Sequence, residues 1–177
     1  MLAVDFEERL LALDWQHRRE AGVSIPATFI QFVAAWRKGG PAPNLEYAVL
    51  PRSCLCEGTY LSIPFRHELV EARVGAEKVY DLLSLIAICT DQYWADEAAE
   101  PGDRELIARC RAGLEAGLDL YLGDLTEAAL SIEARSAILT ILSLLPQARP
   151  EWLPIVTRLR ETEPSALLAA EIDELIA

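Results

Sequence analysis

The sequence predicts an all-α protein, a right-handed helical solenoid of antiparallel helix pairs of the HEAT or armadillo type, with about eight helices. Apolar residues recur at helical spacing along nearly the whole chain of 177 residues. Glycine and proline interrupt this pattern, and its last four segments form two similar pairs. Because the length suits one domain, we expect residues 1–177 to form a single HEAT-like unit, with N-terminal helices and a loop in 1–58 and stacked pairs in 59–177.

The first part of the chain is expected to contain two helices and a loop. The first helix runs from Leu2 to about Glu20, where an Ala-Gly pair ends it. The second opens at Pro26 and ends at the glycine–proline stop of residues 39–41. Helix breakers are dense in residues 41–58, which we interpret as a loop with either a short strand or a single turn at Tyr47 to Leu50.

Helix pairs are expected from Thr59 onward. Pro64 should bend the first of these helices. Residues 91–102 are polar and are interpreted as a connecting loop, and Ser131 is the expected N-cap of a helix that is apolar around most of its circumference. The expected helices are 59–72, 76–90, 103–124, 131–145 and 150–161, followed by a last one from Pro164.

The end of the chain contains a quasi-repeat. The segment from Ser131 to Ala137 aligns with the segment from Glu163 to Ala169, at an offset of 32 residues. Each unit is a helix–turn–helix with an apolar face that only a neighbouring unit can cover. Units of this kind are typical of a helical solenoid. The period is shorter than the roughly 40–47 residues of a HEAT or armadillo unit. Other helical packings therefore remain open at this point.

Three short motifs resemble those of a family of bacterial HEAT-repeat proteins. They are Leu10 to Trp15, then Gly58 to Phe65, then Gly113 to Leu118. The resemblance spans roughly Glu8 to the C-terminus and implies a short N-terminal helical segment followed by HEAT-like pairs. The Asp-x-x-Val-Arg start of a HEAT second helix survives only as Glu133-Ala134-Arg135, and the last unit lacks the arginine.

The same resemblance carries an expectation about function. Some proteins of this kind sit beside secreted-toxin systems and look like immunity proteins. Other HEAT-like relatives are scaffolds, bilin lyases or alkylpurine DNA glycosylases. The glycosylase function requires a basic face for DNA, whereas this chain carries 28 acidic against 16 basic side chains and a net charge of −12.

The negative charge is concentrated in the second half of the chain. Residues 1–90 carry 11 acidic and 9 basic side chains, a net −2, and residues 91–177 carry 17 and 7, a net −10. We predict a partner-binding site where acids and large aromatic residues share the polar loop, because aromatic residues anchor interfaces and acids steer a basic partner. The predicted residues are Asp91, Tyr93, Trp94, Asp96, Glu97, Glu100, Asp103 and Glu105.

Two alternative interpretations concern these acidic regions. Trp94 could instead fold back as a plug on the solenoid, with the surrounding acids solvating a loop. A second acidic group lies near the C-terminus, where Glu161 and Glu163 are expected between helices and Glu171 and Glu174 on the outer face of the last helix. We interpret that group as the polar outer face of a terminal cap.

Residue types that carry catalysis or bind metals are scarce. Cys54-x-Cys56 could form half of a zinc site, but a second pair is missing. Cys89 and Cys110 lie on apolar helix faces, so we predict reduced thiols and no metal or cofactor. His17 and His67 lie among charged residues and are expected at the surface. The tryptophans interpreted as packing residues are Trp15, Trp36 and Trp152.

The sequence therefore predicts a protein-binding HEAT-repeat protein without catalytic activity. The most specific form of this hypothesis is an immunity protein that neutralises a cognate toxin through a basic surface of that toxin. The alternative is a HEAT-like scaffold, or a lyase-type enzyme with polar groups that converge in a concave pocket. We expect a cytoplasmic protein without nucleic-acid or membrane partners, since neither a signal peptide nor a long apolar segment occurs. The oligomeric state is left open.

Overall fold

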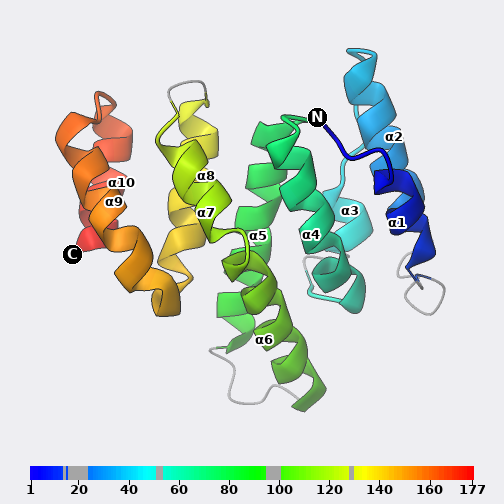
Figure 1. Cartoon of the computed structure of the whole chain (residues 1–177). Helices are drawn as coiled ribbons and strands as arrows, with labels where there is room; N and C mark the ends of the chain where they lie inside the picture. Colours follow the sequence, from blue (N-terminus) through cyan, green and yellow to red (C-terminus); the bar gives the residue numbers. More distant parts are fainter. Residues whose placement is uncertain (14, 16–23, 51–53, 95–100, 128–129) are drawn as a thin grey trace.

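The computed structural model describes residues 1–13, 15, 24–50, 54–94, 101–127 and 130–177. Every regular element in these ranges is helical (Figure 1), so the predicted all-α class is confirmed. The longer helices are α2 (Ile25–Arg37), α4 (Glu57–Glu71), α5 (Ala76–Trp94), α6 (Pro101–Glu115), α8 (Ile132–Ser143), α9 (Arg149–Thr162) and α10 (Ala166–Ile176). The shorter ones are α1 (Phe6–Ala12), α3 (Glu46–Val49), α7 (Leu118–Leu125) and a 3₁₀ turn at Pro146–Ala148.

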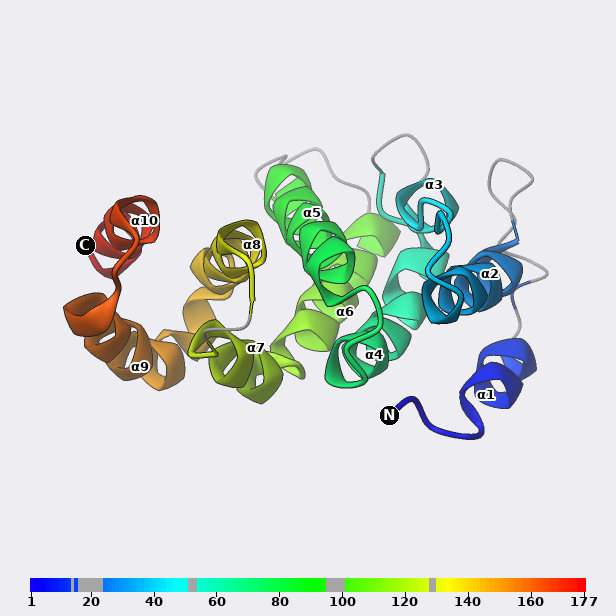
Figure 2. The ribbon, with the colours of Figure 1, turned by 90° about the horizontal axis from the view of Figure 1, so that it is seen from above.

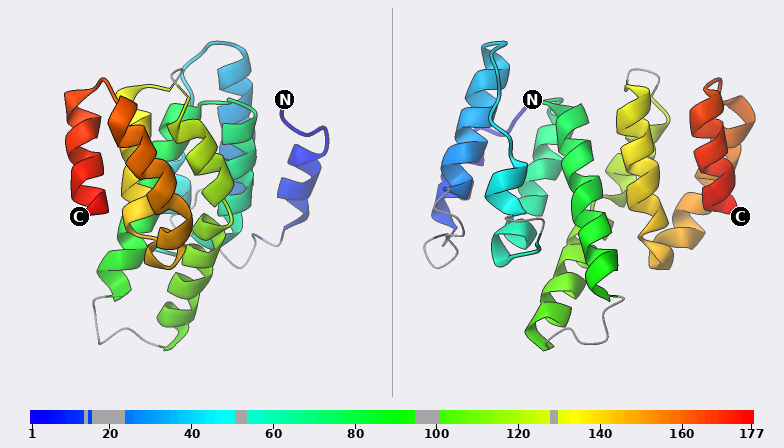
Figure 3. Two further views of the ribbon diagram at one scale, coloured as in Figure 1. Left: turned by 60° about the vertical axis from the view of Figure 1, so that its left-hand side comes forward. Right: turned by 180° about the vertical axis from the view of Figure 1, so that it is seen from behind.

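The helices form two layers, which Figure 2 shows from above. One layer contains α4, α7 and α9, and the other contains α5, α8 and α10. In the second layer α5 packs against α8, and α8 packs against α10. The core lies between the layers, where Tyr80, Leu83, Tyr121 and Ile138 are all fully buried. This arrangement leaves one side of α5, α8 and α10 facing the viewer in the right-hand panel of Figure 3.

Serine residues begin three of these helices. Ser24, Ser131 and Ser165 each accept a hydrogen bond on the side-chain oxygen from the backbone N–H three residues further on. An N-cap of this kind satisfies one of the four N–H groups that a helix leaves without an internal partner. The expected cap at Ser131 is confirmed, and it fixes the start of α8.

The expected single helix over 103–124 is wrong. Helix α6 ends at Glu115, and α7 begins only at Leu118 after a break at Gly117. A Cβ atom at Gly117 would lie 2.6 Å from Nε2 of His67 and 2.7 Å from the hydroxyl of Tyr121. Glycine is therefore required there, because α4 approaches the backbone too closely for a side chain.

Other boundaries also differ from the expectation. Helix α1 ends at Ala12, since Leu13 is already extended. The segment at 47–50 falls largely in the one-turn helix α3 and is not a strand. Helix α5 continues past Thr90 to Trp94, so the connection expected over 91–102 begins later than predicted. Of the polar residues that suggested a loop there, Asp91 and Gln92 belong to the last helical turn of α5.

Candidate protein-binding face

The structure describes only part of the predicted binding loop. Asp91, Asp103 and Glu105 are exposed, and an oxygen of Asp91 lies 3.7 Å from Nη2 of Arg111. Tyr93 and Trp94 belong to the last turn of α5. The remaining predicted residues, Asp96, Glu97 and Glu100, lie outside the described residues. The site therefore remains a prediction, now placed at the junction of α5 and α6.

Many acidic side chains elsewhere are neutralised by arginine. Except for the pair of Asp5 with Arg9, these pairs join different elements of the chain, and several are bidentate. A carboxylate held by a guanidinium adds little to the long-range negative potential, because the two charges cancel. The paired groups are Asp5 and Glu68 with Arg9, Glu57 with Arg109, Asp124 and Glu127 with Arg73, Glu163 with Arg135, and Asp173 with Arg160.

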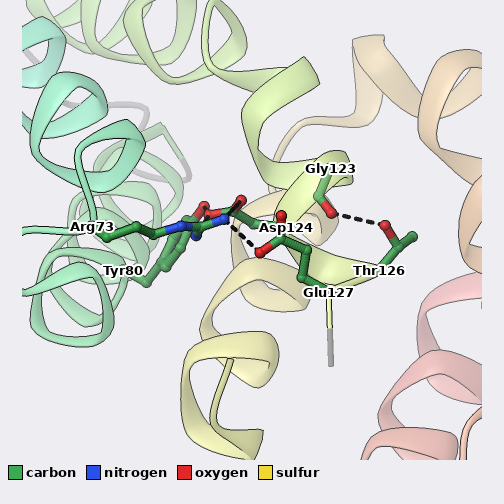
Figure 4. Close-up of polar contacts among 6 residues, drawn as sticks. All are labelled: Arg73, Tyr80, Gly123, Asp124, Thr126 and Glu127. Carbon is green, nitrogen blue, oxygen red and sulfur yellow. Dashed lines mark hydrogen bonds and ion pairs between the residues drawn. The ribbon is translucent and has the colours of Figure 1, made fainter. Parts of the chain in front are cut away.

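One of these pairs, with a buried carboxylate, forms a clasp between α4, α5 and α7 (Figure 4). The side chain of Asp124 is only 5% exposed and accepts two bonds from Arg73, at 2.6 and 2.9 Å. The hydroxyl of Tyr80 donates to the same carboxylate at 2.6 Å. Arg73 also reaches Glu127 at 2.6 Å. Burial and this hydrogen bond raise the pKa of Tyr80, so it stays a neutral donor.

Arg73 occupies an unusual backbone position. Its φ of +58° lies in the left-handed region, at the C-terminus of α4 where glycine is the common residue. The N–H of Val74 bonds the carbonyl of Leu69, as in the usual helix-ending turn. An arginine costs more backbone free energy than glycine here. Its ion pairs with α7 offset that cost, which explains why this position carries a charged side chain.

Three carboxylates in the other layer have no such partner. Glu77 and Asp81 lie one turn apart on α5, and Glu133 lies at the start of α8. All three are exposed, and no cation in the described part of the chain pairs with them. Partial burial raises the pKa of Asp81, and the negative charges of Glu77 and Glu133 raise it further. No ion pair among the described residues therefore neutralises these like charges, although Lys78 and Arg73 line the same hollow as Glu77.

We call the exposed side of α5, α8 and α10, which carries Glu77, Asp81, Glu133 and Glu174, the acidic face. Three hollows lie along the acidic face. One hollow, of about 330 Å³, lies between residues 42–46 and α5, with Leu82 and Leu85 in its wall. A second, of about 290 Å³, is lined by Trp36, Glu77 and Leu130. A third, of about 350 Å³, lies between α8 and α10. Lys78 borders the first two hollows.

The acidic group near the C-terminus is only partly solvated. The carboxylate of Glu163 is 1% exposed and pairs with Arg135, which also donates to the carbonyl of Leu125. Glu171 accepts a hydrogen bond of 3.0 Å from the hydroxyl of Ser136 on α8. The expectation that Glu171 lies on an outer face is therefore wrong. Glu171 thus connects α10 to α8, and Glu163 connects the turn before α10 to α8.

His67 is mostly buried, so its expected surface position is wrong. Its Nε2 lies 2.7 Å from the hydroxyl of Tyr121, and the two rings meet edge to face at 5.6 Å. Burial, together with the positive charge of Arg66, lowers the pKa of His67 to about 4. The imidazole is therefore neutral near pH 7. His17 lies outside the described residues.

Arg66 is a buried cation that the sequence analysis missed. The side chain is fully buried, donates from Nη1 to the hydroxyl of Ser62 and lies over the ring of Phe29 at 5.5 Å. Its Nε and Nη2 atoms have no hydrogen-bond partner among the described residues. Burial lowers the pKa of Arg66 to about 9. In the sequence, the only sign of this burial is helical spacing: Arg66 lies four residues from both Ser62 and Val70, which are buried on the inner side of α4.

The tryptophan and cysteine predictions have mixed outcomes. Trp15 and Trp152 are buried as expected, but Trp36 is 47% exposed beside a hollow, so its expected packing role is wrong. Of the four cysteines, Cys54 is exposed and the other three are buried. Within the described ranges, histidine, cysteine and acidic side chains form no group of three arranged to hold a metal ion.

The chain was compared with protein-family models, curated proteins and solved structures. No protein-family model, no curated protein and no solved structure matches it. Among the helices that the structure describes, none is both long and apolar enough to cross a membrane.

Proposed function

We propose that the chain is a HEAT-like, right-handed solenoid of antiparallel helix pairs that binds a basic protein partner and performs no reaction of its own. The packing of α5 on α8 and of α8 on α10 supports the stacking of pairs. So does the second layer of α4, α7 and α9 (Figure 2). In this arrangement one layer presents its outer side as a continuous binding surface.

The observation that carries this proposal is the group of uncompensated carboxylates Glu77, Asp81 and Glu133. Partial burial and the negative charges of Glu77 and Glu133 raise the pKa of Asp81, and the repulsion among the three carboxylates raises the free energy of the unbound protein. A lysine or arginine of a partner would relieve that repulsion and would also steer the encounter. The hollows beside the carboxylates supply the shape into which partner side chains can fit.

The most specific form of the proposal is an immunity protein. A toxin that acts on nucleic acid needs a basic active site, and an acidic face can cover such a site. The predicted binding residues from Asp91 to Glu105 belong to this proposal as a separate part of the binding site, and Asp91 in the last turn of α5 lies beside Arg111 of α6. We also propose that the protein acts in the cytoplasm, because the spacing of its four cysteines fits no disulfide framework.

Co-expression with the product of the neighbouring gene tests the proposal. We expect the two proteins to co-purify and the host cells to be protected from the toxic product. The triple variant Glu77→Gln, Asp81→Asn, Glu133→Gln should co-purify poorly and protect less. A control variant, Glu7→Gln, Glu115→Gln, Asp119→Asn, removes the same charge from exposed positions elsewhere and should behave like the wild type. Absence of both binding and protection in the wild type would refute the proposal.

A further inference from the structure

The hollow between α8 and α10 differs from the other two in its charge. It has a volume of about 350 Å³, and no cationic side chain lines it. Leu139 and Leu175 form its apolar part, and Glu174 is exposed at its rim. The full lining is Ser136, Leu139, Thr140, Ser143, Glu171, Glu174 and Leu175. The hollow therefore combines an apolar surface with two negative charges.

The polar groups of this hollow offer only acceptors. The hydroxyl of Ser136 donates to Glu171 at 3.0 Å, that of Thr140 to the carbonyl of Ser136 at 3.2 Å, and that of Ser143 to the carbonyl of Thr140 at 2.8 Å. Each hydroxyl has one proton, so these three have none left for a ligand. The ionised carboxylates of Glu171 and Glu174 can only accept. A ligand here must bring its own donors.

We propose that this hollow binds an arginine side chain of the protein partner. The planar guanidinium carries a positive charge and five N–H donors, so it can reach acceptors on both walls at once. Its three-carbon stem can lie along Leu139 and Leu175 while the charged head faces Glu174. A lysine ammonium also supplies charge, but its three donors diverge from one point and span the two helices less well.

This inference rests on the proposed function, since it names the side chain by which the basic partner is held. It assigns the α8–α10 hollow a role distinct from that of the carboxylates on α5. Those charges steer a basic surface toward the protein, whereas the hollow selects one residue type. The second acidic group of the sequence thus acquires a binding role at Glu174 in addition to its structural contacts.

Amide chemical-shift mapping with N-acetyl-arginine amide tests the inference. We expect saturable shifts at Thr140, Ser143, Glu174 and Leu175, with a dissociation constant on the order of millimolar for so small a probe. The lysine analogue should bind several-fold more weakly. The uncharged citrulline analogue, which keeps the shape but not the charge, should bind at least about tenfold more weakly.

The variant Glu174→Gln gives the decisive comparison. It should weaken arginine binding about tenfold, while Glu161→Gln, an equal charge change on α9, should leave binding unchanged. Thermal unfolding of each variant checks that the fold is intact. Equal binding of arginine and citrulline, or binding that Glu174→Gln does not alter, would overturn the inference. If the toxin partner fails to bind but the arginine probe binds as expected, the proposed function fails and the arginine site stands.

Discussion

Replacing Asp124 by alanine is expected to lower the free energy of unfolding by about 2–3 kcal/mol. The carboxylate is nearly fully buried and receives three hydrogen bonds, two from Arg73 and one from the hydroxyl of Tyr80. Its removal leaves the buried phenol of Tyr80 without an acceptor, whereas Arg73, whose side chain is 44% exposed, keeps Glu127 as a partner. Urea denaturation followed by circular dichroism measures the change as a lower midpoint at an unchanged slope.

Glu127 provides the matched control for this measurement. It pairs with the same arginine, but its side chain is 51% exposed. The variant Glu127→Gln should therefore cost less than about 1 kcal/mol. If the two variants lower stability equally, the clasp is an ordinary surface ion pair and does not fix α7 against the α4–α5 pair. If Asp124→Ala has no effect, the described geometry of the clasp is wrong.

Acidification is expected to destabilise the protein through His67. Its pKa is about 4 in the folded protein and near 6.5 in an unfolded chain. Between these values the unfolded chain binds a proton that the folded protein does not, so stability falls as the pH falls from 6.5 to 4. Each pKa unit of difference between the folded and unfolded states corresponds to about 1.4 kcal/mol, so the full loss of unfolding free energy is roughly 3 kcal/mol.

The variant His67→Gln isolates this contribution. Glutamine can still hydrogen-bond the hydroxyl of Tyr121 but has no titrating group. The unfolding free energies of both proteins should be measured at pH 7 and pH 4.5. We expect the wild type to lose about 2–3 kcal/mol more than the variant over this interval. Equal losses would show that the imidazole is solvated in the folded protein.

Local sequence signals predicted most of the helices. Serine caps, proline starts and helical spacing are short-range features, and they placed α2, α8 and α9 within a few residues. The break between α6 and α7 could not be found this way, because it depends on how closely α4 approaches Gly117. The burial of His67 and Arg66 is likewise set by neighbouring helices, whereas their sequence neighbours are charged.

The acidic face shows why a charge count along the chain is incomplete. The count correctly places most of the excess acid after residue 90. It cannot tell which of those acids are neutralised, because Arg73 reaches Asp124 across 51 residues and Arg135 reaches Glu163 across 28. It also overlooks Glu77 and Asp81, which lie in the nearly neutral first half. Only the three-dimensional pairing separates the structural carboxylates from those available to a partner.

The most direct test of the account is the affinity of the co-purified partner for the wild type and for the Glu77→Gln, Asp81→Asn, Glu133→Gln variant, measured over a range of salt concentrations. At low salt we predict that the wild type binds the partner roughly tenfold more tightly than the variant does, mainly because it associates faster. The difference should shrink as salt screens the charges. Equal affinities and equal salt dependence for the two proteins would contradict the claim that the acidic face binds the partner.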